Sequence, residues 1–81
     1  KINNALVIEI NGFTDNIGDK ADNQLLSENR AKVVRELILS EGIVEDRVLF
    51  NGYGEQFPVA DNILDKGRAI NRRTEFRIIR Q

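Results

Sequence analysis

The first ordered element predicted by the sequence is a strand over residues 5–11. Aliphatic residues at even positions alternate there with positions that include Glu9 and Asn11, and this period of two is typical of a strand with one buried face. The even positions are Leu6, Ile8 and Ile10. Residues 12–19, rich in glycine, asparagine and aspartate, predict a loop after this strand.

A long amphipathic helix is expected over residues 22–41, with Gly42 just beyond its end, where a left-handed backbone is often required. At about 100° per residue, the apolar residues fall on one arc of the helical wheel, which we expect to face the sheet. The arc consists of Leu26, Ala31, Val33, Val34, Leu37 and Ile38.

The second half of the chain predicts two further strands, at residues 47–53 and 72–79. The intervening residues 54–71 contain the only proline and are expected to form a loop, with one helical turn near residues 66–70. In the last strand Thr74, Phe76 and Ile78 share one face, and Arg73, Glu75 and Arg77 share the other. This order of elements predicts an α+β fold, a two-layer α/β sandwich in which a long helix covers one face of a mixed sheet and the other face is more polar.

Length and composition fit one small folded domain over residues 1–81. Of the 81 residues 41% are hydrophobic and 31% charged, and no apolar run approaches the roughly 20 residues of a membrane-spanning helix. We therefore expect no membrane insertion by this segment.

The absence of histidine and cysteine excludes several chemistries. Without them the usual zinc and copper sites and the Ser-His and Cys-His catalytic pairs cannot form, so no metal, cofactor or catalytic residue is expected. The net charge of −1 gives no general attraction to nucleic acid. The basic stretch of residues 66–81 also lacks the stacking aromatics of single-strand binders, so we expect no nucleic-acid partner.

Arg30 interrupts the apolar arc of the helix near its centre. A guanidinium on a core-facing surface is costly unless it is paired, and Asp15 in the preceding loop is the expected partner. Two interpretations remain open. The two charges form a salt bridge at the rim of the sandwich, or they stay apart and receive the ammonium and carboxylate of a zwitterionic ligand.

The ordered motifs of the chain resemble those of the OmpA-like peptidoglycan-binding domain, found in outer-membrane anchors, peptidoglycan-associated lipoproteins and flagellar stator proteins. Residues 11–18 read NGFTDNIG and residues 23–31 read NQLLSENRA. The similarity continues through GYGE at 52–55, PVA at 58–60, Asn62, and GRAINRRTEF at 67–76. It therefore extends over nearly the whole chain.

This resemblance implies a specific site and partner. In that family the loop aspartate and the helix arginine, here Asp15 and Arg30, hold the meso-diaminopimelate of the stem peptide of peptidoglycan. By the same resemblance Asn23 and Arg72 line the groove, and Thr14 and Leu26 flank it. The implied function is non-catalytic and noncovalent anchoring of an envelope protein to the wall in the periplasm of a Gram-negative cell, in association with the outer membrane.

Three departures from the family pattern are present. The first, at Phe13, is tolerable, and the other two favour an alternative. Phe13 replaces a frequent histidine, and Asp22 replaces a frequent tyrosine, which adds a negative charge near the ammonium site. Family members also usually begin with another strand and helix, so we expect the domain to be incomplete at its N-terminal side, with an exposed sheet edge that invites pairing with another chain. The alternative function is a structural or assembly domain, such as a homodimer, without productive peptidoglycan binding.

Two further interpretations of the sequence are disfavoured. Residues 52–55 lack the spacing of a glycine-rich phosphate cradle and are expected to form a turn where Tyr53 packs at the layer edge. Asp15 is poorly suited to act as the general acid of a glycan hydrolase, because an adjacent Arg30 would keep its pKa low.

Arg68 and Arg73 are expected to hold the loop that precedes the last strand by hydrogen-bonding to backbone carbonyls or to an acidic side chain.

Overall fold

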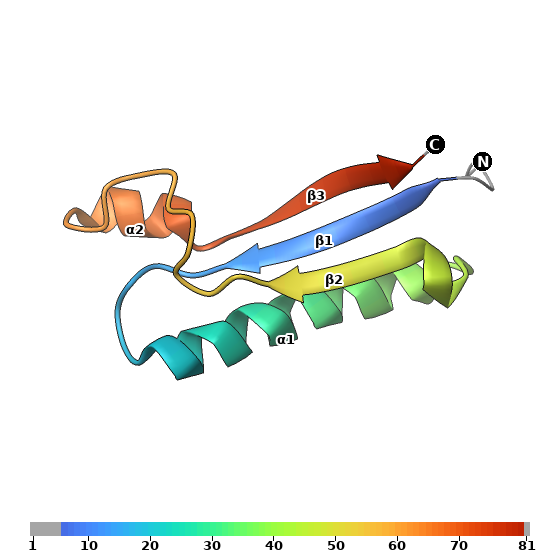
Figure 1. Ribbon diagram of the computed structural model, residues 1–81, viewed down its shortest axis with the longest axis horizontal. Helices are drawn as coiled ribbons and strands as arrows, with labels where there is room; N and C mark the ends of the chain where they lie inside the picture. The colour runs from blue at the N-terminus through green and yellow to red at the C-terminus, as the bar shows by residue number, and fades with distance from the viewer. Residues whose placement is uncertain (1–5, 81) are drawn as a thin grey trace.

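The computed structural model describes residues 6–80 and shows a three-stranded sheet with a long helix packed on one face (Figure 1). Strand β1 lies in the centre, parallel to β2 and antiparallel to β3, so the sheet is mixed as predicted. The elements in chain order are β1 (Val7–Phe13), α1 (Lys20–Leu39), a 3₁₀ turn (Glu45–Arg47), β2 (Val48–Gly52), α2 (Asp65–Asn71) and β3 (Arg73–Arg80).

Helix α1 begins two residues earlier than predicted because Asp19 caps it. The Asp19 carboxylate accepts the backbone N–H of Ala21 at 2.7 Å and that of Asp22 at 3.3 Å, which satisfies two of the free N–H groups of the first turn. The helix ends at Leu39, also two residues earlier than predicted. Gly42 adopts the expected left-handed backbone, with φ of 95°, in the turn that follows.

The remaining elements differ from prediction only at their ends. Strand β1 begins and ends two residues later than residues 5–11, and Ala5 lies outside the described residues. Strand β2 is shorter at both ends than residues 47–53, and β3 is shifted by one residue from residues 72–79. The predicted helical turn is the seven-residue helix α2, which starts at Asp65.

Two glycines bring the sheet very close to α1. Gly12 and Gly52 lie opposite each other in the register of β1 and β2. A Cβ added at Gly12 would clash with the backbone carbonyl of Ser27, and one added at Gly52 would clash with the backbone N–H of Glu28. The backbones of sheet and helix therefore touch, which only glycine permits at these positions.

This close approach turns the helix away from the predicted orientation. The buried positions of α1 are Asn23, Ser27 and Ala31. These small residues lie about 100° around the wheel from Leu26, whereas the prediction placed the centre of the buried face near Arg30. Because a narrow contact accommodates small side chains, part of the predicted arc lies outside it, although Val34 and Ile38 still pack against the core. The prediction that the whole arc faces the sheet was therefore wrong in part. Leu26, Val33 and Leu37 are 42%, 60% and 64% exposed.

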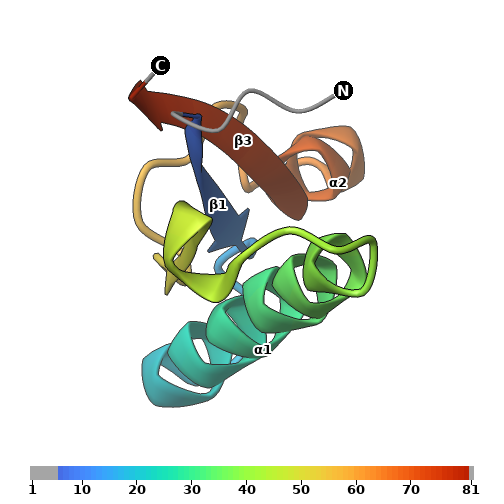
Figure 2. The same cartoon turned by 90° about the vertical axis from the view of Figure 1, so that its right-hand side faces the viewer.

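The fully buried apolar core is small and lies under β1 and β2. Ile10, Ala31 and Val48 form it, and α1 packs against these two strands. Strand β3 lies on the other side of β1, beyond the reach of the helix, as the end-on view in Figure 2 shows. Phe76 and Ile78, on the same face of the sheet as Ile10, consequently remain 62% and 57% exposed.

The opposite face of the sheet carries a polar network, as predicted. Asn51 Nδ2 donates to Glu9 Oε2 at 2.9 Å and to Asn11 Oδ1 at 3.2 Å. Arg77 approaches the same glutamate from β3, with 3.8 Å between Nη1 and Oε1. Side chains from all three strands are thus joined across this face.

Candidate functional site

Asp15 lies two residues beyond the end of β1 and is buried, with 8% of its surface exposed. Its Oδ1 accepts the backbone N–H of Ile17 at 3.0 Å, and its Oδ2 accepts Nη1 of Arg72 at 2.7 Å. The residue just before β3 therefore closes onto the loop after β1. Sequence and structure agree in bringing Asp15 and Arg72 to one site.

The surroundings of Asp15 favour its ionised form. Burial by itself raises the pKa of this carboxyl, but the Ile17 N–H and the hydrogen bond and charge of Arg72 act the other way. Arg68 adds a smaller effect of the same sign, and the net result is a pKa below the ordinary value of 3.8. The site thus presents a fixed negative charge at neutral pH.

Asn23 and Thr14 hold the loop that carries Asp15. Asn23 is buried in the first turns of α1, and its Nδ2 donates to the carbonyl of Ile17 at 3.0 Å and to that of Asp15 at 3.4 Å. Thr14 is also buried, and its Oγ1 donates to the Asp15 carbonyl at 2.8 Å. The backbone N–H of Thr14 donates to the carbonyl of Gly54, which ties the loop to the end of β2. Both side chains thus hold the loop in place through its backbone carbonyls.

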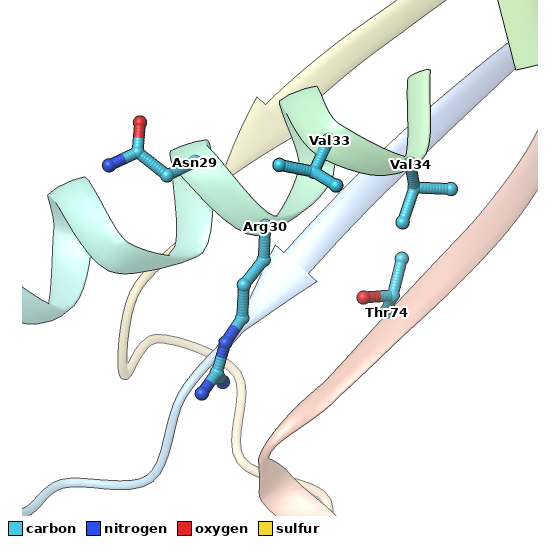
Figure 3. A pocket seen from close by; sticks show the side chains of 5 residues that line it. All are labelled: Asn29, Arg30, Val33, Val34 and Thr74. Atoms are coloured by element: carbon cyan, nitrogen blue, oxygen red, sulfur yellow. The ribbon is translucent and has the colours of Figure 1, made fainter. Parts of the chain in front are cut away.

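Arg30 borders an open groove between α1 and β3, which we call the α1–β3 groove. The groove has a volume of about 390 Å³ and is lined by Asn29, Arg30, Val33, Val34 and Thr74. In Figure 3 the Arg30 side chain extends away from the two valines, toward the end of β1 and the loop beyond it. Within residues 6–80 no hydrogen bond or ion pair engages its guanidinium, which lies on an exposed part of the helix.

One expectation about Arg30 was wrong, and one of the two open interpretations is excluded. It does not lie at the centre of the core-facing arc, because the helix turns its small residues to the sheet. The Asp15–Arg30 salt bridge does not form either, since Arg72 takes the place of Arg30 beside the carboxylate. The two predicted charges are therefore separate, one fixed in a buried network and one free at the groove.

Leu26 and Asp22 lie on the outer side of the site. Leu26 is one turn before Arg30 on the same flank of α1 and is 42% exposed. Asp22 is exposed in the first turn of the helix, where a carboxylate is favourable to the helix dipole. Leu26 is not among the residues that line the α1–β3 groove.

The segment before β3 is held by Asn71, a role that the sequence analysis did not assign. Asn71 is completely buried, and its Oδ1 accepts the backbone N–H groups of Val59 and Ala60 at 2.8 and 3.0 Å. Its Nδ2 donates to the Ala60 carbonyl and to Asn62. Asn62 and Asn71 both lie within the motifs that resemble the family, and this was the signal from which the role could have been found. Arg72, the next residue, is thereby fixed at Asp15.

Arg68 and Arg73 have the roles predicted for them. Arg68 Nη1 donates to the carbonyl of Asn62 at 2.7 Å, and its Nη2 pairs with Asp65. Arg73 Nη2 donates to the carbonyl of Phe57 at 3.0 Å, and its guanidinium lies over the ring of Phe13, 3.8 Å from the centroid. Phe13, at the position of a frequent histidine, therefore serves as a packing surface.

Tyr53 packs at the edge of the layer, as expected. Its ring stacks on Phe13, with 5.4 Å between centroids, and meets Phe57 edge-on at 5.6 Å. The turn that begins at Tyr53 includes Gly54, which has φ of 59°, and is closed by the Gln56 N–H, which donates to the Tyr53 carbonyl at 3.1 Å. These contacts support the turn assigned to residues 52–55.

The residues that the structure describes contain no group of three acidic side chains placed to hold a metal ion. Neither helix among them has the length and apolar composition needed to cross a membrane.

Comparison with known proteins identifies the family. The OmpA family model matches residues 1–72. Outer membrane porin F of Pseudomonas aeruginosa is 52% identical over 67 residues, which are 82% of this chain and 19% of the porin. The peptidoglycan-binding protein ArfA of Mycobacterium tuberculosis is 41% identical over 68 residues, 84% of this chain and 21% of that protein. The chain thus spans about a fifth of the length of these relatives.

Solved structures show the same fold. The C-terminal domain of Helicobacter pylori MotB superimposes with a TM-score of 0.86 at 27% identity, over 95% of this chain and 60% of that one. The cell wall anchor of the type VI secretion system of Pseudomonas aeruginosa gives 0.82 at 30% identity, over 94% of this chain and 56% of that one. With the ordered motifs, the mixed sheet and the Asp15 loop in place, these matches lead to one conclusion: the chain belongs to the OmpA family.

Proposed function

We propose that this chain is a non-catalytic, single-domain module that binds peptidoglycan noncovalently through the meso-diaminopimelate of the stem peptide, in the periplasm. The observation that carries the proposal is the separation of the two charges. Asp15 is held ionised by Arg72 and Ile17, whereas Arg30 borders the α1–β3 groove without a partner among residues 6–80. A zwitterionic end of an amino acid supplies the opposite charge for each.

The proposed ligand contacts follow from the hydrogen-bonding capacity of each group. A carboxylate accepts about four hydrogen bonds, and Asp15 receives two from the protein, which leaves capacity for an ammonium group. The free guanidinium of Arg30 can bind a carboxylate in a bidentate manner. Thr74 lines the α1–β3 groove, and Arg72, two residues before Thr74, donates to the Asp15 carboxylate. The residues at the start of β3 therefore connect the groove with that carboxylate.

The names of related proteins support the wall as partner. ArfA is named a peptidoglycan-binding protein, and the similar type VI secretion structure is a cell wall anchor. Porin F, with 52% identity, is an outer membrane protein. We infer for this chain a place in the periplasm next to the outer membrane, where it reaches the wall.

Affinity per site is expected to be modest. One zwitterion offers few contacts, and Arg30 is exposed to screening by salt. Because peptidoglycan repeats the same stem peptide, several modules acting together would still anchor an envelope protein firmly.

The test is an NMR titration of the folded chain with a stem peptide containing meso-diaminopimelate. A lysine-containing stem peptide serves as the ligand control, since it keeps the side-chain ammonium but lacks the carboxylate proposed to bind Arg30. We expect saturating shifts at Asp15, Asn23 and Arg30 with the first peptide and at least about tenfold weaker binding of the second, the loss of a charge-assisted hydrogen bond.

Arg30→Gln is the most informative variant because the guanidinium of Arg30 makes no hydrogen bond or ion pair in the described part of the chain, so the fold should be unaffected. Lys32→Gln removes a positive charge from an exposed position of the same helix and is the matched control. We expect Arg30→Gln to lose the preference for diaminopimelate and Lys32→Gln to retain it. Equal binding of both peptides by the unmodified chain would refute the proposed ligand.

A structural or assembly role is the second candidate function, and one observation favours it. The outer edge of β3 has no neighbouring strand among residues 6–80, and the apolar side chains beside it are exposed. Because this alternative lacks productive peptidoglycan binding, a titration in which neither peptide shifts the resonances of a well-folded chain would favour it over wall binding.

A further inference from the structure

Strand β2 has an outer edge whose backbone groups point away from β1. The N–H of Tyr53, just after the end of β2, donates to the carbonyl of Gly12 in β1 at 3.0 Å. Because successive residues of a strand direct their backbone groups to opposite sides, Val48, Phe50 and Gly52 direct theirs to the outer edge. The question is what these three outward carbonyls meet.

The sequence of β2 carries no protection of its own against edge pairing. Residues 48–53 read VLFNGY, with no charge and no proline, and segments of this kind readily stack strand on strand. Leu49 and Phe50 are 44% and 36% exposed. In β3, by contrast, four of the eight residues are charged. Charged side chains are a common means of preventing edge pairing, and β2 has none.

Two side chains of α1 bond outward carbonyls of β2. Arg35 Nε donates to the carbonyl of Val48, and Gln24 Nε2 donates to that of Gly52, each at 2.5 Å. Two of the three outward carbonyls are thus bonded to the helix, one at each end of the strand. A strand arriving at this edge would need these same carbonyls.

Further contacts hold both side chains at the edge. Arg35 Nη2 donates to the carbonyl of Glu45 at 3.0 Å, and its guanidinium lies over the ring of Phe50, 5.7 Å from the centroid. Gln24 Nε2 also donates to Glu28 Oε2 at 3.0 Å, one helical turn further along. The Arg35 side chain therefore spans the first half of the strand, from the turn before it to Phe50.

The spacing of the two helix residues matches the length of the strand. Gln24 and Arg35 are 11 residues apart, about three helical turns, so they lie on one side of α1 about 16 Å apart. The carbonyls that they bond are four residues apart, about 13 Å along β2. One side of α1 accordingly follows the edge of β2, and Figure 1 shows the helix alongside this strand.

We propose that Gln24 and Arg35 act as an edge guard, which prevents β2 from pairing with β2 of a second copy of this chain. An arriving strand would have to break both hydrogen bonds and move a guanidinium out of its place. This inference goes beyond the proposed wall binding and does not depend on it, since neither residue is a proposed ligand contact. If both hold, modules crowded on one wall stay separate.

Removal of the guard is the first test. The double variant Gln24→Ala/Arg35→Ala leaves the outward carbonyls of β2 open. Sedimentation over a concentration series should show it associating at least about tenfold more tightly than the unmodified chain, the equivalent of one to two hydrogen bonds. Lys32→Ala removes a positive charge from an exposed position of the same helix, so it is the control and should sediment like the unmodified chain. Circular dichroism checks that each variant is folded.

A further substitution locates the association. Leu49→Lys places a charge on the edge strand at a position that is already 44% exposed, so it should return the double variant to the monomer. Hydrogen exchange gives a second readout, because the Phe50 N–H points to the outer edge. We expect this amide to become protected when the double variant associates and to lose that protection when Leu49→Lys is added.

Several results would overturn the proposal. One is a folded double variant that sediments like the unmodified chain, and another is an association that Leu49→Lys leaves intact. A third is an unmodified chain that already associates and is returned to the monomer by Leu49→Lys alone. Should the double variant not fold, Gln24→Ala and Arg35→Ala are measured singly, and a folded single variant that associates no more tightly than Lys32→Ala is equally decisive.

Discussion

Two regions of this small domain differ in what they bury. At one end the buried side chains are polar and hydrogen-bonded, and we call this the polar end. It consists of Thr14, Asp15, Asn23, Ser27 and Asn71. Along the outer side of α1 and the same face of β3 the large apolar side chains are exposed, and we call this the apolar flank. It consists of Leu26, Val33, Leu37, Phe76 and Ile78.

The two regions differ in the kind of interaction that dominates each of them. Hydrogen bonds are directional, so those of the polar end fix the conformation of the loop that carries Asp15. Apolar contact is non-directional, so the apolar flank can accept a partner along its length. The polar end is therefore expected to be sensitive to small changes, and the apolar flank tolerant of large ones.

The largest effect is expected from Gly12→Ala at the polar end. The added methyl would clash with the Ser27 carbonyl, and both backbones belong to packed elements that cannot easily move apart. We expect a loss of about 3 kcal/mol or more in the free energy of unfolding, measured by urea denaturation. Gly18→Ala is the control for backbone strain alone: its φ of 93° disfavours alanine, but its added methyl meets no atom within 4 Å, so it should lose less than Gly12→Ala. A similar, small loss in both would show that sheet and helix are not in contact.

A smaller effect is expected from Asp15→Asn, and it should depend on pH. Because the pKa of Asp15 is lowered on folding, its carboxylate stabilises the fold above pH 3.8, and this contribution is lost as the pH falls through the folded-state pKa. We expect the variant to lose about 1–2 kcal/mol at neutral pH, since Arg72 is partly exposed. The difference from the unmodified chain should shrink as the pH falls from about 5 to below 3.8.

Arg72→Gln sharpens the same comparison from the other side of the ion pair. It removes the partner that lowers the pKa of Asp15, so it should show a similar narrowing of its difference from the unmodified chain at low pH. Denaturation curves for both variants across this pH range provide the check. A difference independent of pH would mean that the pair contributes no charge-dependent stability.

The smallest effect is expected on the apolar flank. Val33→Gln and Leu37→Gln replace side chains that are 60% and 64% exposed, so the free energy of unfolding of the monomer should change by less than about 0.5 kcal/mol. Ala31→Gln, on the buried side of the same helix, should be strongly destabilising. Denaturation at low protein concentration measures all three. Losses above about 1.5 kcal/mol in the first two would show that the flank is covered in the monomer.

Local patterns were sufficient to predict the elements. Period-two alternation identified β1, and the turn at Gly42 marked the end of α1 to within a few residues. The ends were less well predicted because caps and pairing partners set them. Asp19 extends α1 toward its N-terminus, and the pairing with β2 and β3 carries β1 through to Phe13.

The candidate site was predictable in part. The ordered motifs identified the residues and the family, and Asp15, Asn23, Thr14 and Arg72 do come together. The sequence did not show which of these residues form the ion pair and which hold the loop in place. Asn71, which fixes Arg72 through four hydrogen bonds, has a role that depends on residues about ten positions away.

The sequence by itself determined the order of the elements, the fold class and the family, since these depend on local periodicity and on motifs in a fixed order. Only the tertiary structure decided which side of α1 faces the sheet and which arginine meets Asp15. A helical wheel ranks sides by hydrophobicity, whereas contact through Gly12 and Gly52 selects the side with the smallest residues. That choice turns Arg30 out to the α1–β3 groove and leaves the carboxylate to Arg72.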